Sequence, residues 1–211
     1  MKDFNIQDFF NTDWDYGNEV LHNLCSGDNL YHTESSVIIA KTLFIGRIYS
    51  ASINRVQNPA DIETGDIFYT NTVVEKFMDG RIDDDFRMLL SMNAQSIEYD
   101  FIPKILQVHK NLVDIIAEIV KQNDRSFASK YLHFHFRNLF FIYDNRAKKG
   151  LRKYFKKIPH AYSFNRSKFD YEYASFYCRC HALQAKLKRE HPHFADKITP
   201  RVVDNILIRR E

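Results

Sequence analysis

Apolar residues recur along most of the chain at steps of three and four positions, which is the spacing of one face of an α-helix. The first clear case runs from Val37 to Val56 and ends at Asn58-Pro59. The second opens at Pro103, where proline suits a first helical turn, and ends at Asn123-Asp124. The pattern therefore predicts two long helices in the first two thirds of the chain.

Further helices are predicted from shorter patterns and from capping residues. They cover Thr70 to Met78 before Gly80, a segment opened by Asp83, Asp84 and Asp85, Ser126 to Phe136, Asp144 to about Lys157, Tyr171 to Glu190, and Pro200 to Arg209 behind a Thr199 cap. No alternating run is long enough for a sheet, and six glycines and five prolines are few for 211 residues. The prediction is one all-α domain, a compact helical bundle with two lobes.

Charge divides the chain into two unlike parts. Residues 1–124 hold ten Lys/Arg and twenty Asp/Glu, a net charge of −10, whereas residues 125–211 hold twenty and seven, a net charge of +13. We interpret residues 1–124 as an acidic scaffold lobe and residues 125–211 as a basic lobe that carries the candidate site. Two explanations are open: a polyanionic partner for the basic lobe, or acidic and basic surfaces that face each other within the chain or in a dimer.

Composition favours a soluble cytoplasmic protein. Three cysteines are too few for a disulfide framework and indicate reduced thiols. No apolar run approaches the ~20 residues that span a bilayer, and the first ten residues do not resemble a signal peptide. We therefore expect no membrane association.

The segment from Asn145 to Lys168 is the strongest candidate for binding nucleic acid. Aromatic side chains interleave with its cations, a combination suited to phosphates and unstacked bases. It contains nine cations and no acid: Arg146, Lys148, Lys149, Arg152, Lys153, Lys156, Lys157, Arg166 and Lys168. A merely solvated helix face is the alternative, and nine cations without an acid favour a polyanion, DNA or another nucleic acid.

Lys130 and Asp144 form the candidate catalytic pair. Lys130 lies in the first turns of one predicted helix and Asp144 opens the next, after the apolar run Leu139 to Tyr143. A helix, a short loop and a second helix can bring the two side chains together. A lysine among apolar neighbours is desolvated, which lowers its pKa and favours an amine nucleophile.

The segment from Arg125 to Arg146 resembles the helix-hairpin-helix DNA glycosylases, particularly 8-oxoguanine DNA glycosylase-like proteins. Ser126 to Lys130 matches the lysine of that superfamily, and Phe141 to Asp144 matches its aspartate. The segments Arg47 to Ser50 and Arg201 to Asp204 are similar to parts of small bacterial proteins of this kind. The resemblance is therefore to a short, divergent bacterial member.

The resemblance implies a role in DNA repair by base excision, with possible substrates among oxidised or modified bases and an additional lyase activity at abasic sites. Lys130 would attack the sugar C1′ of a base turned out of the duplex, and Asp144 would stabilise the cationic sugar and move protons. Phe127, Tyr131 and Tyr143 are candidates to stack on the extruded base.

Two differences from the superfamily keep other functions open. The stretch from Gln122 to Ser129 lacks the hairpin glycines, and the fourteen positions from Lys130 to Asp144 are a short interval. They favour a non-catalytic nucleic-acid-binding or host-defence protein on the same fold. In that case Asp144 is an ordinary N-cap and Lys130 an exposed helix residue.

No metal or cofactor is expected. His133 and His135 are two positions apart, so on a helix they point in different directions and do not suit one metal. We interpret both as core or surface histidines. No phosphate-binding loop or zinc-protease pattern occurs in the sequence.

Overall fold

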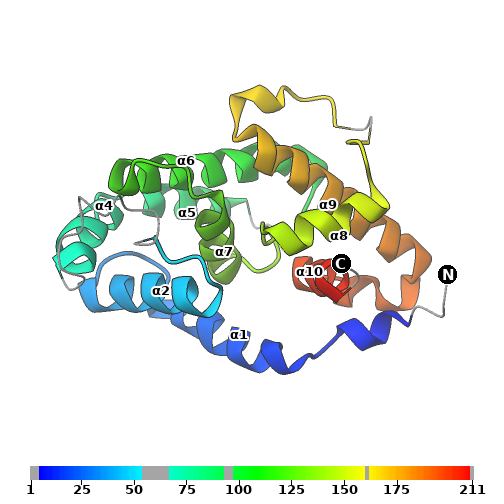
Figure 1. Ribbon diagram of the computed structural model, residues 1–211, viewed down its shortest axis with the longest axis horizontal. Coiled ribbons are helices and arrows are strands. Elements are labelled where there is room, and N and C mark those ends of the chain that lie inside the picture. Colours follow the sequence, from blue (N-terminus) through cyan, green and yellow to red (C-terminus); the bar gives the residue numbers. More distant parts are fainter. Residues whose placement is uncertain (1–4, 54–66, 93–96, 160–161, 210–211) are drawn as a thin grey trace.

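The computed structural model describes residues 5–53, 67–92, 97–159 and 162–209, and every regular element in these ranges is a helix (Figure 1). The predicted all-α class is therefore confirmed. Within the described residues no helix is both long and apolar enough to cross a membrane. Cys25, Cys178 and Cys180 are buried free thiols.

Nine α-helices carry the described structure. They are α1 (Asp13–Leu24), α2 (Ser35–Ile48), α4 (Val74–Phe77), α5 (Arg81–Ser91), α6 (Ile102–Val120), α7 (Arg125–His135), α8 (Asn145–Tyr154), α9 (Tyr171–Glu190) and α10 (Pro200–Arg209). Short helical segments connect them: 3-10 helices η1 (Ile6–Phe9), η2 (Gly27–Asn29), η6 (Tyr99–Phe101), η7 (Arg166–Lys168) and η8 (Pro192–Lys197), and the π-helix η5 (Phe68–Val73).

The predicted helices are present, with differences at their ends. The last two, α9 and α10, have the predicted bounds. α2 ends at Ile48, eight residues before the predicted end, because Ser50 takes a left-handed backbone conformation with φ 52°. Asn58-Pro59 lies outside the described residues. The predicted helix from Thr70 is continuous from η5 into α4.

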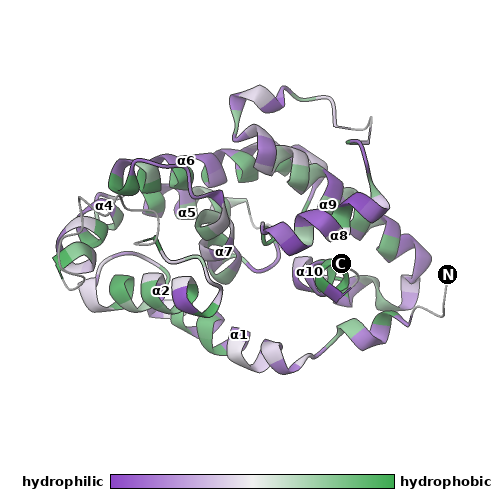
Figure 2. Cartoon of the chain, in the orientation of Figure 1, coloured by the Kyte–Doolittle hydropathy of each residue, from purple (hydrophilic) through white to green (hydrophobic). Residues whose placement is uncertain are grey.

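The helices form two packed groups. α7 contacts α6, α2 and α1, and α5 packs on α6. α8, α9 and α10 contact one another on the other side of the molecule (Figure 1). Hydropathy follows this packing, because the sides of the helices that face their neighbours are the more apolar ones (Figure 2). The chain between α7 and α8 joins the two groups.

That connecting segment is a buried loop, Leu139 to Tyr143, with no regular hydrogen bonding of its own. Side chains satisfy its backbone instead. His133 Nδ1 donates to the Phe140 carbonyl at 2.8 Å, and Ser129 Oγ accepts the Tyr143 amide at 2.9 Å. Tyr173 and Tyr177 of α9 donate to the carbonyls of Phe141 and Leu139 at 3.1 and 2.7 Å. Unpaired buried backbone groups are costly, so these bonds fix the loop and the residue that follows it.

α8 and α10 cross at very close range. A Cβ added at Gly150 of α8 would lie 2.2 Å from the carbonyl oxygen of Leu207 in α10. Gly150 is therefore required for this crossing, and Leu207 backbone atoms cannot move without shifting α10.

Substituting Gly150→Ala should destabilise the protein by about 3 kcal/mol, because the new methyl group overpacks a rigid helix crossing. Gly17→Ala is the matched control: Gly17 is helical, and an added Cβ meets nothing within 4 Å. That variant should be stabilised by about 0.5 to 1 kcal/mol. Urea denaturation measures both, and equal stabilities of the two variants would contradict the close crossing.

Candidate active site

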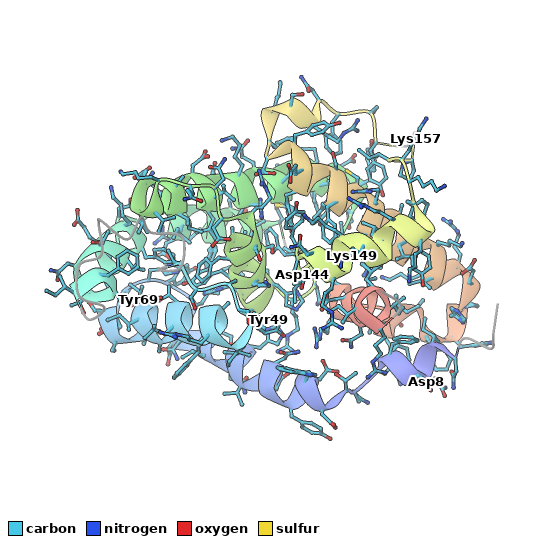
Figure 3. The ribbon with its side chains drawn as sticks, in the orientation of Figure 1. Asp8, Tyr49, Tyr69, Asp144, Lys149 and Lys157 are labelled. Atoms are coloured by element: carbon cyan, nitrogen blue, oxygen red, sulfur yellow. The ribbon has the colours of Figure 1, made fainter. Side chains whose placement is uncertain are left out.

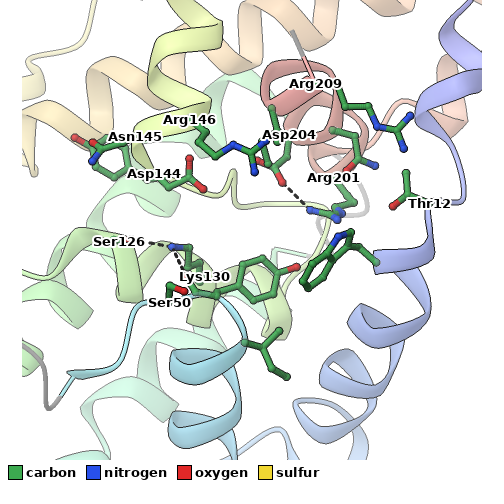
Figure 4. Close-up of a pocket in the computed structure, with 16 residues that line it drawn as sticks. Thr12, Ser50, Ser126, Lys130, Asp144, Asn145, Arg146, Arg201, Asp204 and Arg209 are labelled. Atoms are coloured by element: carbon green, nitrogen blue, oxygen red, sulfur yellow. Dashed lines mark hydrogen bonds and ion pairs between the residues drawn. The ribbon is translucent and has the colours of Figure 1, made fainter. Parts of the chain in front are cut away.

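A cavity of about 770 Å³ lies among five helices (Figure 4). One side is formed by α7 and the end of α2. The other side is formed by α10 and by the starts of α8 and α1. Residues from five helices and their ends form its walls. They are Thr12, Trp14, Ile48, Tyr49, Ser50, Ser126, Lys130, Tyr143, Asp144, Asn145, Arg146, Arg201, Asp204, Asn205, Ile208 and Arg209. The predicted pair, Lys130 and Asp144, is brought together in this cavity.

Lys130 is buried, with 3% of its surface exposed. Its Nζ donates to Ser126 Oγ at 2.9 Å and to the Tyr49 carbonyl at 3.2 Å. Burial lowers the pKa of Lys130, and the nearby charge of Asp144 opposes that shift. The alternative of an exposed helix lysine is therefore wrong, and the expected desolvation of the amine is confirmed.

Asp144 is a helix cap that also lines the cavity. It is the N-cap of α8 and accepts the Ala147 amide at 2.8 Å. It also lines the cavity, and Figure 4 shows its side chain and that of Lys130 entering the same space from adjacent segments. A carboxylate that caps a helix is held rigidly, because its position is tied to the backbone of the first turn.

The opposite wall holds a buried row of charges. Asp204 Oδ2 accepts from Arg201 Nη1 at 2.6 Å, and Arg201 Nε donates to Asp15 Oδ1 at 3.0 Å. Asp204 is 3% exposed. Its burial raises its pKa to about 7, a shift that Arg201 opposes and Asp144 reinforces. The cavity therefore contains two carboxyl groups that face one amine.

The predicted stacking residues are only partly in place. Tyr143 lines the cavity, and its hydroxyl donates to Glu172 at 2.9 Å. Phe127 and Tyr131 are fully buried, and the Tyr131 hydroxyl is bonded to His32 Nε2 at 2.7 Å. The prediction that Phe127 and Tyr131 stack on a base is wrong, because both rings fill the core behind Lys130. The exposed aromatic ring at the cavity is Trp14, 62% exposed.

The predicted cations extend from the cavity along α8 and beyond. Arg146 lines the cavity, and Lys148 lies over the Tyr143 ring at 5.0 Å. Arg166 is half-buried and donates to the Tyr162 carbonyl at 2.9 Å. The others are exposed, as Figure 3 illustrates for two of them: Lys149, Arg152, Lys153, Lys156, Lys157 and Lys168.

Among the described residues, two ion pairs connect acidic side chains of residues 1–124 with arginines of residues 125–211. Arg137 pairs with Glu19 at 3.0 Å, and Arg201 pairs with Asp15. Neither pair involves the cations of α8, and among the described residues no acidic side chain pairs with Arg152 or Lys157. Internal pairing thus explains part of the charge asymmetry and leaves a basic surface beside the cavity.

His133 and His135 are core histidines. His133 donates from Nδ1 to the Phe140 carbonyl and His135 to the Tyr131 carbonyl, each at 2.8 Å. Burial lowers the pKa of both side chains. Within the described parts of the chain, no group of three or more His, Cys, Asp or Glu side chains is placed to bind a metal ion.

No role was predicted for Asp204 or Trp14, although both line the cavity. The sequence drew attention to Asp204 only within the segment Arg201 to Asp204, which resembles small bacterial proteins. A carboxylate on the apolar face of α10 is nevertheless unusual and could have marked it. Trp14 lies on α1, a helix that was not predicted because its apolar positions are too few and too scattered.

Three comparisons with known proteins found no match: no family model, no curated protein and no solved structure matches the chain.

The raised pKa of Asp204 predicts how stability depends on pH. Folding favours the protonated carboxyl, so its stabilising effect is complete below pH 3.8 and is lost as the pH rises to about 7. Wild type should lose up to about 4 kcal/mol relative to Asp204→Asn over that range. Urea denaturation of both proteins at several pH values measures the difference.

The control is Asp79→Asn. Burial is the largest single influence on Asp79 and raises its pKa, but the hydrogen bonds and charge of Arg81 together lower the pKa below its usual value. The stability difference for that variant should change with pH in the opposite direction. A difference for Asp204→Asn that stays constant from pH 4 to 7 would show that Asp204 is ionised throughout.

Proposed function

We propose that this protein is a DNA base-excision glycosylase with an associated lyase activity, in which Lys130 is the nucleophile. One observation carries the proposal: a desolvated lysine and a rigid helix-capping aspartate share a cavity large enough for a nucleobase and its sugar. Drug-sized and cofactor ligands occupy cavities of roughly 300 to 1,000 Å³. The resemblance of the segment around this pair supports the same activity.

The chemistry assigns a task to each side chain. The neutral Lys130 amine attacks C1′ while the C1′–N bond breaks, and the bonding electron pair leaves with the base, which takes up a proton. The Asp144 carboxylate stabilises the positive charge that develops on the sugar. It then moves a proton from the amine to O4′ as the ring opens, which leaves a Schiff base between Lys130 and C1′. Loss of a C2′ proton from that species expels the 3′ phosphate and cleaves the strand.

The surroundings of the cavity suit a nucleic-acid substrate. The cations of α8 begin at the cavity with Arg146 and continue along its exposed face, where they can contact phosphates. Trp14 offers an exposed indole at the cavity, and Tyr143 a ring inside it. Base flipping needs such aromatic faces to replace the stacking that the base loses.

A second candidate function is non-catalytic nucleic-acid binding, and one observation favours it. Lys130 Nζ donates to a backbone carbonyl, Tyr49 O, as well as to Ser126. A carbonyl acceptor stabilises the ammonium form, which is not nucleophilic. In this case the basic surface binds DNA and Lys130 holds the end of α2 in place.

Borohydride trapping tests the catalytic proposal. Purified protein is mixed with labelled duplexes that carry 8-oxoguanine, uracil or an abasic site, and the Schiff base is reduced to a stable amine. Wild type should form a covalent adduct, and Lys130→Met should form none, because methionine fills the same space without a nucleophile. Adducts are measured by denaturing gel electrophoresis.

Lys41 provides a matched control for a buried, perturbed amine. It is fully buried, burial lowers its pKa to about 8, and it does not line the cavity. Lys41→Met should therefore still form the adduct if it folds, as circular dichroism can establish. An adduct that persists in Lys130→Met would refute the assigned nucleophile. Absence of any wild-type adduct, with DNA binding retained, would favour the binding protein.

The basic surface makes a separate prediction. Replacing Arg152 and Lys157 by alanine should weaken DNA binding and reduce the slope of log Kd against log salt by about 1.8, at ~0.9 per lost phosphate contact. The paired change Lys104→Ala and Lys110→Ala on α6, away from the cavity, should leave the slope unchanged. Fluorescence anisotropy across a salt series measures both. Equal slopes for the two double variants would place the DNA elsewhere.

A further inference from the structure

The second carboxyl group of the cavity, Asp204, has an oxygen that the folded protein does not use. Its Oδ2 is bonded to Arg201, whereas its Oδ1 is buried and has no hydrogen-bond partner among the described residues. A buried polar atom without a partner is costly and needs an explanation, of which a bound group or a catalytic role is one. Asp204 lines the same cavity as Lys130 and Asp144. The folded protein therefore leaves one oxygen of a cavity-lining carboxyl without a partner.

Two properties of the surroundings suit Asp204 to carry a proton at neutral pH. Burial raises its pKa to about 7, and the negative charge of Asp144 adds to that effect. Arg201 bonds the other oxygen at 2.6 Å, so the carboxylate that remains after proton loss is already paired. A group that holds a proton at neutral pH, and is stabilised once it has given the proton away, meets the requirements of a general acid.

We propose that Asp204 is the general acid that protonates the departing base. The inference rests on the proposed glycosylase activity and adds a third residue, after Lys130 and Asp144, to the proposed catalytic site. The base lies against α10, with Asp204 Oδ1 toward a ring nitrogen or carbonyl oxygen, and the sugar lies between Lys130 and Asp144. Asp144 acts at the sugar, and Asp204 acts at the base.

The step balances without a further reagent. The Lys130 nitrogen forms a bond to C1′ as the C1′–N bond breaks, and the electron pair of that bond moves onto the base. The proton of Asp204 Oδ1 transfers to the base, which leaves as a neutral molecule. The resulting Asp204 carboxylate is paired with Arg201, and solvent protonates it again once the base has left.

Other charged groups from every neighbouring element set the protonation of Asp204. Arg201 on its own helix and Lys130 on α7 lower its pKa, and Asp144 at the start of α8 raises it. Tyr49 at the end of α2 and Cys180 on α9 interact with it electrostatically, and Asp15 on α1 acts through the shared Arg201. Burial also lowers the pKa of Lys130. A rise in pH therefore activates the Lys130 amine by removing its proton, whereas it inactivates the Asp204 acid by removing its proton.

Single-turnover kinetics on two substrates separates these groups. Base release from a duplex with 8-oxoguanine or uracil requires both Lys130 and Asp204, whereas borohydride trapping on a preformed abasic site has no base to expel and requires Lys130 alone. For wild type, the ratio of base release to abasic trapping should fall as the pH rises through about 7, as Asp204 loses its proton. Asp204→Asn should slow base release by about 100-fold or more, make the ratio independent of pH and leave abasic trapping intact.

The outcomes distinguish the inference from the function on which it rests. If wild type neither traps on the abasic duplex nor releases a base, the proposed function fails and the inference fails with it. If wild type is active and Asp204→Asn releases base at the wild-type rate, only the inference is overturned. Should Asp204→Asn not fold, the wild-type ratio decides: a fall through about pH 7 supports the acid, and a constant ratio refutes it.

Discussion

The buried loop from Leu139 to Tyr143 is the constraint on which the candidate site depends. Five apolar residues cross the core without helical hydrogen bonds, and side chains of α7 and α9 supply the partners that their backbone needs. Because the Tyr143 amide is held by Ser129, one residue before Lys130 on α7, the loop delivers Asp144 next to the lysine. The short interval between Lys130 and Asp144 thus corresponds to an extended loop whose two ends are held by hydrogen bonds.

The charges of the cavity depend on one another. Lys130 is desolvated, and the nearby carboxylates limit the fall in its pKa. Asp204 is desolvated as well, and Arg201 limits the rise in its pKa. Burial therefore lowers the pKa of Lys130 and raises that of Asp204, and an opposite charge limits each shift. Ionisable groups with perturbed pKa values that share a cavity are typical of functional sites.

The sequence predicted the helical class, the bounds of α9 and α10 and the proximity of Lys130 and Asp144, which line one cavity. These features depend on local patterns: apolar spacing, capping residues and the polarity of one short loop. Phe127 and Tyr131 were assigned wrongly because a sequence does not show whether an aromatic ring next to Lys130 faces the cavity or the core. The positions of Trp14 and Asp204 beside one cavity depend on contacts such as that of Arg201 with Asp15, 186 positions apart, and no local pattern encodes such contacts.

Those long-range contacts explain how an ionisable group as costly as Asp204 is kept in place. The N-terminal segment crosses α10: Asn205 donates to the Phe9 carbonyl at 3.1 Å, and Arg209 donates to the Asp8 carbonyl at 2.6 Å. Arg201 adds the pair with Asp15 at the start of α1. On the other side, Gly150 allows α8 to approach the Leu207 backbone.

α10 is thus held between the first helices of the chain and α8, and it cannot turn to bring Asp204 to solvent. Since a buried carboxyl oxygen without a partner is otherwise drawn toward water, this double restraint keeps Asp204 Oδ1 buried. An apolar residue at this position would be more stabilising than a buried carboxyl with an unpaired oxygen, so stability alone does not account for Asp204.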